Sequence, residues 1–322
     1  MPDVGSVLVY VGLDAVGDGL IKLPFVRALR AAFPAARITW LAGKGHTVFA
    51  DTLAPVVAGL IDEVIDEAEI GSRLPELLDN PLPGRAFDLI IDTQRRVLTT
   101  LILKRIRHER FISATAAYLF SNGKPGNTAR PASLAGQMMQ LAEAAAGHPV
   151  EADFPLPRDP EVEAEADRLL PPGRRYVGLA PGAGGKHKCW PLERYIALAA
   201  GLTDAVPVFL LGPAEAGDWA GTIRAALPQA LLPLQQTPAL TPMLTIALGR
   251  RMAAAVSNDS GTGHMLGAAD IPLVSLFGPT AADKFAPHTR RAMVLRAQDF
   301  GGAAMEAIPP EAVEKALRQL LL

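Results

Sequence analysis

The apolar run at residues 6–13 contains no polar alternation, and it constrains the fold more than any other feature of the chain. A strand with one solvated face alternates polar and apolar residues, so an unbroken run predicts a strand buried on both faces, as in a parallel sheet. A helical pattern follows at residues 20–33, and a second strand-like run at residues 38–41. This order predicts a βαβ unit, with Pro24 in the first turns of its helix, where it fits or kinks them.

The same alternation of short apolar runs and helical segments continues along the chain. Further strands are expected at residues 63–65, 87–92 and 110–112, and in the second half at 176–180, 208–211, 253–257 and 273–277. This is the pattern of doubly wound α/β sheets. Since 322 residues exceed the usual size of one core, we expect two domains. The stretch at residues 149–172, rich in proline and acid, predicts a division into residues 1–165 and 166–322.

Composition excludes several classes of protein. With 49% hydrophobic and 20% charged residues and no apolar run long enough to span a bilayer, the chain is expected to be a soluble globular protein. A net charge of -2 gives no basic excess for a nucleic-acid partner. The single Cys189 can form neither an internal disulfide nor a zinc site, and the N-terminus lacks a signal-peptide pattern. We therefore expect a cytoplasmic protein.

Two charged stretches each leave two interpretations. The basic stretch Lys104, Arg105, Arg107 and Arg110 follows an apolar segment; it is either a solvated helix face or a surface for an anionic substrate or lipid headgroups at the inner face of the cytoplasmic membrane. The acidic residues Glu161, Glu163, Glu165 and Asp167 alternate along a helix. Because residues two apart on a helix point in different directions, this spacing favours a solvated helix over a metal cluster.

The loop after the first strand, residues 14–19, contains Gly17 and Asp18. Its glycines would let the backbone approach a ligand, and its amides would lie at a helix N-terminus, where anions are favoured. The G-x-G-x-x-G order of dinucleotide-binding loops is absent, which argues against a nicotinamide cofactor. Asp18 is either a helix N-cap or a carboxylate that acts as a general base.

The loop after the strand at residues 176–180 is glycine-rich and basic. It contains Gly182, Lys186 and Lys188 and leads into Pro191, a favourable first-turn residue of a helix. Flexible glycines and two lysines at the carboxyl end of a strand predict a phosphate-binding loop.

Two further loops follow strands at the same expected edge. Residues 257–264 read SNDSGTGH, and the amides of Gly261, Thr262 and Gly263 could cradle a diphosphate at the start of a helix around residues 265–269. Ser260 and Thr262 add hydroxyl donors, and His264 lies in the first turn beside Asp259. The last of these loops contains Gly278 and Thr280. Most of the loops thus suit a phosphate-bearing ligand.

Taken together, these motifs resemble glycosyltransferase family 9, the lipopolysaccharide heptosyltransferases. The resemblance rests on VGD at residues 16–18, FDLIIDTQ at 87–94, APGA at 180–183, KCWP at 188–191, SNDSGTGH at 257–264 and FGPT at 277–280. It implies the GT-B fold, with two Rossmann-like domains facing across a cleft. The family usually has a small polar residue where this chain has Lys22, and the position of Cys189 and that of Gly263 also depart from its pattern.

The resemblance also implies roles for residues. Asp18 matches the catalytic base and Lys188 the lysine on the donor phosphates. Other matches to the donor site are Glu215, Asp259, Ser260, Gly261, Thr262, Gly263 and His264, with Gly17, Gly182, Lys186, Gly278 and Thr280 as additional candidates. The implied reaction is metal-independent, inverting transfer of a sugar such as heptose from a nucleotide diphosphate sugar such as ADP-heptose to a lipopolysaccharide core or related glycan. The C-terminal domain would hold the donor and the N-terminal domain the glycolipid or glycan acceptor.

Two other functions fit the same loops. A sugar-nucleotide epimerase of the GT-B fold would rearrange or release the donor without an acceptor. A non-catalytic sugar-nucleotide-binding protein would keep the donor loops but have no use for a base at Asp18.

Overall fold

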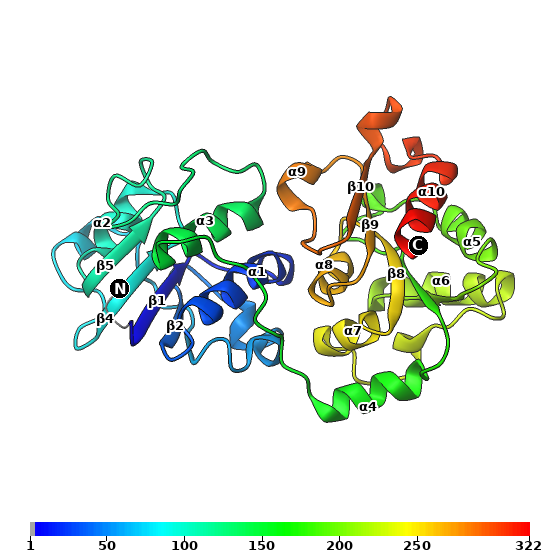
Figure 1. Ribbon diagram of the computed structural model, residues 1–322, viewed down its shortest axis with the longest axis horizontal. Helices are drawn as coiled ribbons and strands as arrows, with labels where there is room; N and C mark the ends of the chain where they lie inside the picture. Colours follow the sequence, from blue (N-terminus) through cyan, green and yellow to red (C-terminus); the bar gives the residue numbers. More distant parts are fainter. Residues whose placement is uncertain (1–3) are drawn as a thin grey trace. The chain divides into compact units, whose positions relative to one another are not determined.

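The computed structural model describes residues 4–322 and divides into two compact units between Pro157 and Arg158 (Figure 1). The predicted division after residue 165 falls inside helix α4 (Pro160–Leu169), which belongs wholly to the second unit. Asp159 caps this helix by accepting hydrogen bonds from the amides of Glu161 and Val162. Ala166 and Leu169 are buried in the core of the second unit, which is why the helix belongs there.

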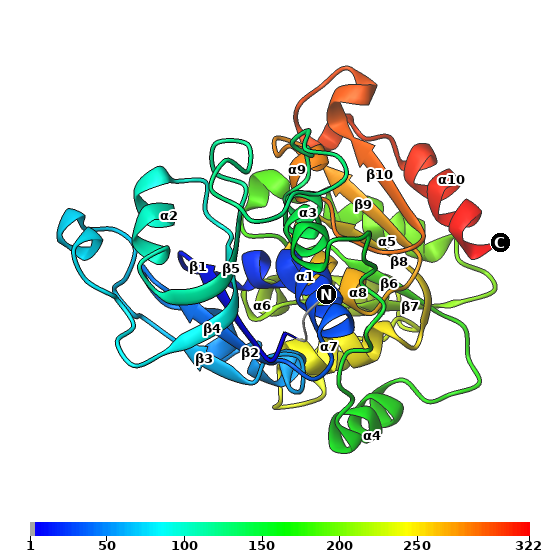
Figure 2. The same ribbon diagram turned by 60° about the vertical axis from the view of Figure 1, so that its left-hand side comes forward.

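The first unit is built on a parallel sheet of order β3-β2-β1-β4-β5. Its strands are β1 (Ser6–Val11), β2 (Arg37–Ala42), β3 (Glu63–Ile65), β4 (Ala86–Asp92) and β5 (Arg107–Ser113). Its helices are α1 (Val16–Ala32), α2 (Val97–Leu103) and α3 (Leu134–Ala146), with short 3-10 helices η1 (Val48–Ala50), η2 (Ala54–Val57) and η3 (Leu74–Leu77). Helices α1 and α3 pack together on one face of the sheet, and α2 covers the other (Figure 2).

The second unit repeats the architecture with the order β10-β9-β8-β6-β7. Its strands are β6 (Tyr176–Ala180), β7 (Val206–Phe209), β8 (Met252–Asn258), β9 (Leu273–Phe277) and β10 (Ala292–Arg296). The remaining elements are α5 (Leu192–Ala200), α6 (Pro213–Ala226), α7 (Pro242–Gly249), α8 (Gly261–Ala268), α9 (Ala282–Phe285), α10 (Pro310–Leu321), η4 (Lys186–Lys188), η5 (Pro233–Gln235), η6 (Ala297–Phe300) and η7 (Met305–Ala307). Helices α5, α6 and α10 share one hydrophobic core with the sheet, and α4, α7 and α8 share the other.

Each sheet has one point at which the direction of winding reverses. It lies between β1 and β4 in the first unit and between β6 and β8 in the second, because these neighbours in the sheet are not neighbours in the sequence. In doubly wound sheets a ligand binds outside the carboxyl ends of the strands at such a point. A ligand is therefore expected to bind at the loops after β1, β4, β6 and β8.

The strands were predicted more closely than the helix starts. Strands β3, β6 and β9 coincide with the expected ranges, β7 begins two residues earlier than expected, and the edge strand β10 was not predicted. Helix α1 begins at Val16 instead of residue 20, so Pro24 lies in its middle instead of its first turns, and α8 begins at Gly261 instead of residue 265. In both helices the glycine-containing segment that we expected to be a loop is the first helical turn.

The charged stretches also differ from expectation. The basic stretch is not one helix face: Lys104 ends α2, whereas Arg107 and Arg110 lie on β5. The acidic helix α4 is only partly solvated, because Glu163 pairs with Arg250 at 2.7 Å and with Arg251 at 2.9 Å. No helix within residues 4–322 is long and apolar enough to cross a membrane.

Candidate functional site

A cavity of about 260 Å³ lies at the winding reversal of the first unit. Asp18 and Lys22 of α1 line it, together with residues 93–95 after β4 and Arg130 before α3. Asp18 supplies a carboxylate to this cavity, while Lys22, Arg95 and Arg130 supply three cations. The cavity could hold a polar ligand with a hydroxyl near Asp18.

Asp18 is the third residue of α1, so it is not the N-cap, which is Ala15. Its carboxylate accepts a long hydrogen bond, 3.4 Å, from the Ala15 amide, and a carboxylate at this position is favoured by the helix dipole. The two glycines beside it have different surroundings. Gly17 has open space around it, whereas a methyl group on Gly19 would lie 2.8 Å from Val48 and 2.9 Å from Leu53. Gly19 is therefore needed for packing and not for approach to a ligand.

Sequence reasoning missed the ion pair that holds Lys22 in this cavity. Its ammonium contacts the carboxylate of buried Asp14, which also accepts hydrogen bonds from Trp40 Nε1 at 3.2 Å and Thr47 Oγ1 at 2.9 Å. Burial lowers the pKa of Lys22 to about 8. The signal available in the sequence was an acidic residue directly after a buried strand together with the unusual lysine one turn beyond Asp18.

A second buried carboxylate, Asp92, holds the segment at residues 93–95 that lines the cavity. Its oxygens accept hydrogen bonds from Thr100 Oγ1 at 2.7 Å, Ser113 Oγ at 2.9 Å and the Gln94 amide at 2.8 Å. The carbonyl of Gln94 accepts from Thr115 Oγ1 at 3.2 Å. Both polar groups of the Gln94 backbone are thus held, which fixes the segment that lines the cavity.

In the second unit, the loops after β6 and β8 meet through Lys188 and Asp259. The Lys188 ammonium lies 3.0 Å from Asp259 Oδ2, and the two side chains are 30% and 11% exposed. Buried Asn258 joins the same loops: its Oδ1 accepts from the Trp190 amide at 3.2 Å, and its Nδ2 donates to the Pro181 carbonyl at 2.6 Å. The loops after β6 and β8, both of which were expected to bind phosphate, are therefore held against each other.

The segment after Asp259 forms the start of α8. Ser260 is the N-cap, and its hydroxyl accepts from the Gly263 amide at 3.2 Å. Gly261, Thr262, Gly263 and His264 are the first four helical residues; Gly261 and Thr262 are half-buried, and His264 is buried. A methyl group on Gly263 would lie 2.7 Å from Ser257 Oγ and 3.0 Å from the Asn258 carbonyl, so this position requires glycine.

Glu215, in the first turn of α6, lies beside the glycine-rich loop. A methyl group on Gly182 would be 2.8 Å from its carboxyl carbon, and one on Gly212 would be 2.8 Å from Oε2. Burial, together with the nearby charge of Glu215, raises the pKa of the Cys189 thiol. The structure thus brings Glu215 to the loop that carries Lys188.

The additional candidates have more varied positions. Lys186 is exposed, while Lys188 is half-buried. Gly278 packs against η7, since a methyl group there would lie 2.7 Å from Met305 Sδ. Thr280 Oγ1 is buried and has no hydrogen-bond partner within residues 4–322. In that part of the chain no group of three or more His, Cys, Asp or Glu side chains is arranged to hold a metal ion.

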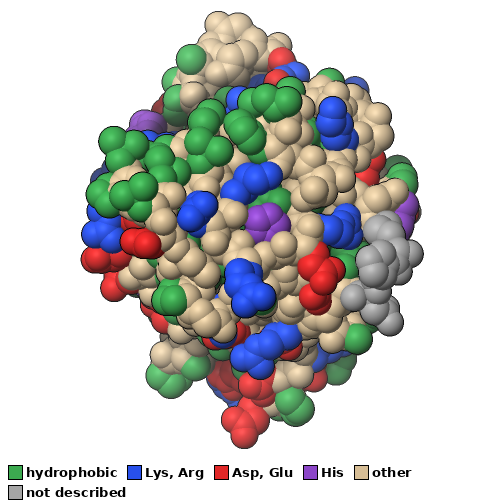
Figure 3. Space-filling view, turned by 90° about the vertical axis from the view of Figure 1, so that its left-hand side faces the viewer, with side chains coloured by type: hydrophobic (Ala, Val, Ile, Leu, Met, Phe, Trp, Pro, Cys, Tyr) green, Lys and Arg blue, Asp and Glu red, His purple; other side chains and the backbone are tan. Residues whose placement is uncertain are grey.

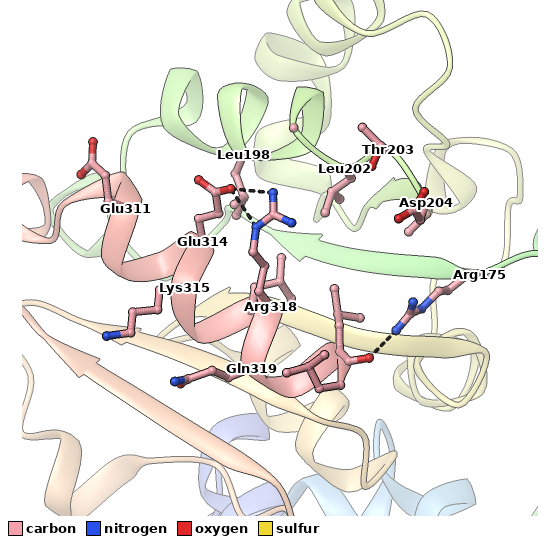
Figure 4. A pocket seen from close by; sticks show the side chains of 15 residues that line it. Arg175, Leu198, Leu202, Thr203, Asp204, Glu311, Glu314, Lys315, Arg318 and Gln319 are labelled. Atoms are coloured by element: carbon pink, nitrogen blue, oxygen red, sulfur yellow. Dashed lines mark hydrogen bonds and ion pairs between the residues drawn. The ribbon is translucent and has the colours of Figure 1, made fainter.

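A further cavity in the second unit, of about 580 Å³, lies elsewhere (Figure 4). Helix α10 and residues 201–205 form much of its wall, and Arg175 and Ala205 on its lining directly precede β6 and β7. It therefore lies at the amino ends of these strands. Glu314 and Arg318 pair with each other there at 2.8 Å, and none of the predicted site residues lines it.

The known proteins that this chain resembles in sequence are heptosyltransferases. Residues 78–307 match the family model for glycosyltransferase family 9 (heptosyltransferase). The chain is 35% identical over 127 residues to lipooligosaccharide heptosyltransferase 2 of Haemophilus influenzae. The aligned residues make up 38% of this chain and only 37% of that protein. It is 29% identical over 304 residues to lipopolysaccharide heptosyltransferase 1 of Pseudomonas aeruginosa, and this alignment covers 85% of this chain and 79% of that protein.

The fold agrees with these matches. The structure of the E. coli heptosyltransferase WaaC with ADP superimposes with a TM-score of 0.67 at 19% identity and covers 98% of this chain and 99% of that one. The two parallel α/β sheets are thus those of the GT-B fold. Since the family model covers well over half of the residues, the chain belongs to glycosyltransferase family 9, the heptosyltransferase family.

Proposed function

We propose that this chain is an inverting glycosyltransferase that moves heptose from ADP-heptose to a lipopolysaccharide core or a related glycan. The observation that carries the proposal is the position of Asp18, a half-buried carboxylate that lines a cavity at the winding reversal of the first sheet. The names of its relatives, which are lipopolysaccharide and lipooligosaccharide heptosyltransferases, support the choice of sugar and acceptor. The WaaC structure with ADP supports the choice of nucleotide.

The donor belongs to the second unit in this proposal. Lys188 supplies a positive charge beside the N-terminus of α8, where the amides of Gly261 and Thr262 are available for the diphosphate. The Lys188 ammonium has three donors and gives one to Asp259, so the others remain for phosphate oxygens. In this proposal Glu215, which lies beside Gly182, accepts hydrogen bonds from the ribose.

The acceptor belongs to the first unit, in the cavity that Asp18 lines. The acceptor hydroxyl attacks the anomeric carbon from the side opposite the diphosphate, and Asp18 removes its proton. A well-placed general base contributes roughly 10²–10⁴-fold to the rate. The charge that develops on the departing diphosphate is stabilised by Lys188 and the α8 amides. Since these groups provide the positive charge, we propose that transfer needs no metal ion.

An acceptor-dependent assay tests this function. Release of ADP from ADP-heptose is measured with and without a lipopolysaccharide core acceptor, and with EDTA added. Transfer predicts release that needs the acceptor and survives EDTA. Release without an acceptor would indicate an epimerase or hydrolase, and binding of ADP with no release in either arm would indicate a binding protein. Loss with EDTA that Mg²⁺ restores would contradict metal independence alone.

A further inference from the structure

The segment after β5 contains a strained turn. Ala116, Ala117 and Tyr118 have φ angles of 50°, 53° and 67°, so three successive residues adopt the left-handed helical conformation. This conformation is unfavourable for a residue that carries a Cβ, and it normally occurs at single positions. We refer to residues 116–118 as the left-handed turn. Because backbone strain of this kind gathers at active sites, ligand clamps and switch regions, the turn is a candidate for a functional role.

The left-handed turn directs one polar side chain inward. Ala116, Ala117 and Leu119 are exposed, whereas Tyr118 is only 1% exposed. Figure 3 looks onto the side of the molecule on which α2 and β5 lie in Figure 1, and it shows exposed hydrophobic side chains in its upper part. The Tyr118 hydroxyl is buried and has no hydrogen-bond partner within residues 4–322. Since a buried hydroxyl without a partner is destabilising, both the backbone and the side chain of Tyr118 are unfavourable in this conformation.

Tyr118 lies close to a wall of the Asp18 cavity. Arg95 and Ala114 line that cavity, and the Arg95 guanidinium donates to the Ala114 carbonyl at 3.5 Å. Burial raises the pKa of the Tyr118 hydroxyl and the charge of Arg95 opposes this increase, so the guanidinium is near the phenol. A guanidinium has five N–H donors, and Arg95 keeps some of them for a ligand. An oxygen atom in the cavity could therefore accept from both side chains.

The two ends of the turn are held firmly. Before it, Thr115 is buried and its hydroxyl has hydrogen-bond partners on both sides. After it, Ser121 Oγ donates to the Ser113 carbonyl and accepts from the Ser113 amide, both at 2.7 Å. Between these ends, the Leu119 amide closes the turn by donating to the Ala116 carbonyl at 3.1 Å. The turn can thus change its conformation between two fixed ends.

We propose that the left-handed turn is a gate for the acceptor: when the acceptor occupies the Asp18 cavity, the turn relaxes and the Tyr118 hydroxyl donates to an acceptor oxygen beside Arg95. The hydroxyl then gains the partner that it lacks, and residues 116–118 leave an unfavourable conformation. Exposure of the buried ring opposes this change, which keeps the gate closed without acceptor. The choice of ligand rests on the proposed function.

Acceptor binding by the full chain tests the role of Tyr118 without any turnover. A deacylated lipopolysaccharide core oligosaccharide is titrated calorimetrically into the protein in the presence of ADP. We expect Tyr118→Phe to bind it at least fivefold more weakly, with unchanged ADP affinity and a melting temperature no lower than that of wild type. Tyr176→Phe is the control: it removes a hydroxyl that donates to the Pro171 carbonyl at 2.7 Å, so it should lower the melting temperature and leave acceptor binding unchanged.

Ala117→Gly tests the gate, because glycine adopts a positive φ readily and so favours the closed turn. Hydrogen exchange of the Leu119 amide reports opening. This exchange should become at least fivefold faster in wild type when the oligosaccharide and ADP are added, and about threefold slower in free Ala117→Gly. The same variant should bind the oligosaccharide about threefold more weakly. Glu67→Gly is the control, since Glu67 is left-handed with a φ of 48° but does not line the cavity.

Any one of three results overturns the proposal. They are oligosaccharide binding by Tyr118→Phe equal to wild type, exchange of the Leu119 amide that the oligosaccharide does not change, or exchange and binding that Ala117→Gly leaves unchanged. Failure of the proposed function gives a different result. If wild type binds the oligosaccharide but transfers nothing from ADP-heptose, transfer fails while the variants still decide the gate. If wild type does not bind the oligosaccharide, both proposals fail.

Discussion

The Lys188 ammonium lies 3.0 Å from the Asp259 carboxylate, and this contact joins the loops that follow β6 and β8. The two loops are far apart in the sequence but adjacent at the winding reversal of the sheet. Asn258 makes the same connection through the backbone of Trp190 and Pro181. A lysine held in this way has a fixed direction and keeps donors for a ligand, unlike a solvated surface lysine.

Replacing this lysine tests the donor site. Lys188→Ala should weaken ADP binding about tenfold or more, because a hydrogen bond to a charged group contributes about 1.5–3 kcal/mol. Lys186→Ala is the matched control: it removes the same charge from an exposed position two residues earlier and should change ADP affinity by less than about threefold. Calorimetric titration of both variants with ADP is the measurement. The reverse order of effects would mean that Lys186 is the phosphate ligand.

Replacing Asp18 tests the catalytic base. Asp18→Asn keeps the shape of the side chain and its place in the first turn of α1, so stability and ADP affinity should stay near wild type. Turnover should fall about 10²-fold or more, because the amide cannot take the proton. Steady-state kinetics with saturating donor and acceptor measure this. Turnover near wild type would leave Asp18 only its contact with the Ala15 amide, and the base would have to be sought elsewhere.

The buried Asp92 predicts a pH dependence of stability. Burial raises the pKa of this carboxyl from 3.8 to about 6, although Thr100, Ser113 and the Gln94 amide donate to it. The folded chain therefore holds a proton that the unfolded chain releases between about pH 4 and pH 6. This contribution to stability is complete below about pH 4 and is lost as the pH rises through 6.

The measurement compares urea unfolding of wild type and Asp92→Asn. The free energy of unfolding of wild type relative to the variant should fall by about 2 kcal/mol between pH 4.5 and pH 7. The comparison cancels the titration of other groups that both proteins share. A constant difference across this range would show that Asp92 keeps an ordinary pKa in the folded protein.

The sequence predicted the sheets well because buried parallel strands leave a distinct pattern. Unbroken apolar runs such as that of β1 have few alternative structures, and three strands coincide with their expected limits. Strand β10 lies at an edge with partly exposed residues, so it lacks this pattern. The starts of α1 and α8 were placed too late because Gly17, Gly19, Gly261 and Gly263 suggested loops, whereas in the structure Asp18 and Ser260 stabilise these first turns.

Contacts between distant residues could not be predicted from one sequence. Asp14 and Lys22 are close along the chain, but the burial of their pair depends on Trp40 and Thr47, which come from β2 and the residues after it. The contacts of Asn258 likewise depend on how β6 and β8 pair. The motif placed Asn258 in the right loop, yet its role in holding Trp190 and Pro181 appears only in three dimensions.

The division of the chain predicts that the second unit folds and binds nucleotide by itself. A fragment of residues 158–322 contains both hydrophobic cores of this unit and the whole of α4 with its Asp159 cap. It also contains Lys188, Asp259 and Glu215. We expect cooperative unfolding and measurable ADP binding by calorimetry, with no transfer because Asp18 is absent.

A shorter fragment provides the control. Residues 166–322 lack the Asp159 cap and both ion pairs of Glu163 with Arg250 and Arg251, so this fragment should be less stable by roughly 1–2 kcal/mol or more. Introducing Lys188→Ala into the longer fragment should weaken ADP binding as in the full chain, because the contacts of Lys188 lie within this unit. A folded 158–322 fragment that does not bind ADP, together with a 1–157 fragment that does, would show that the donor belongs to the first unit.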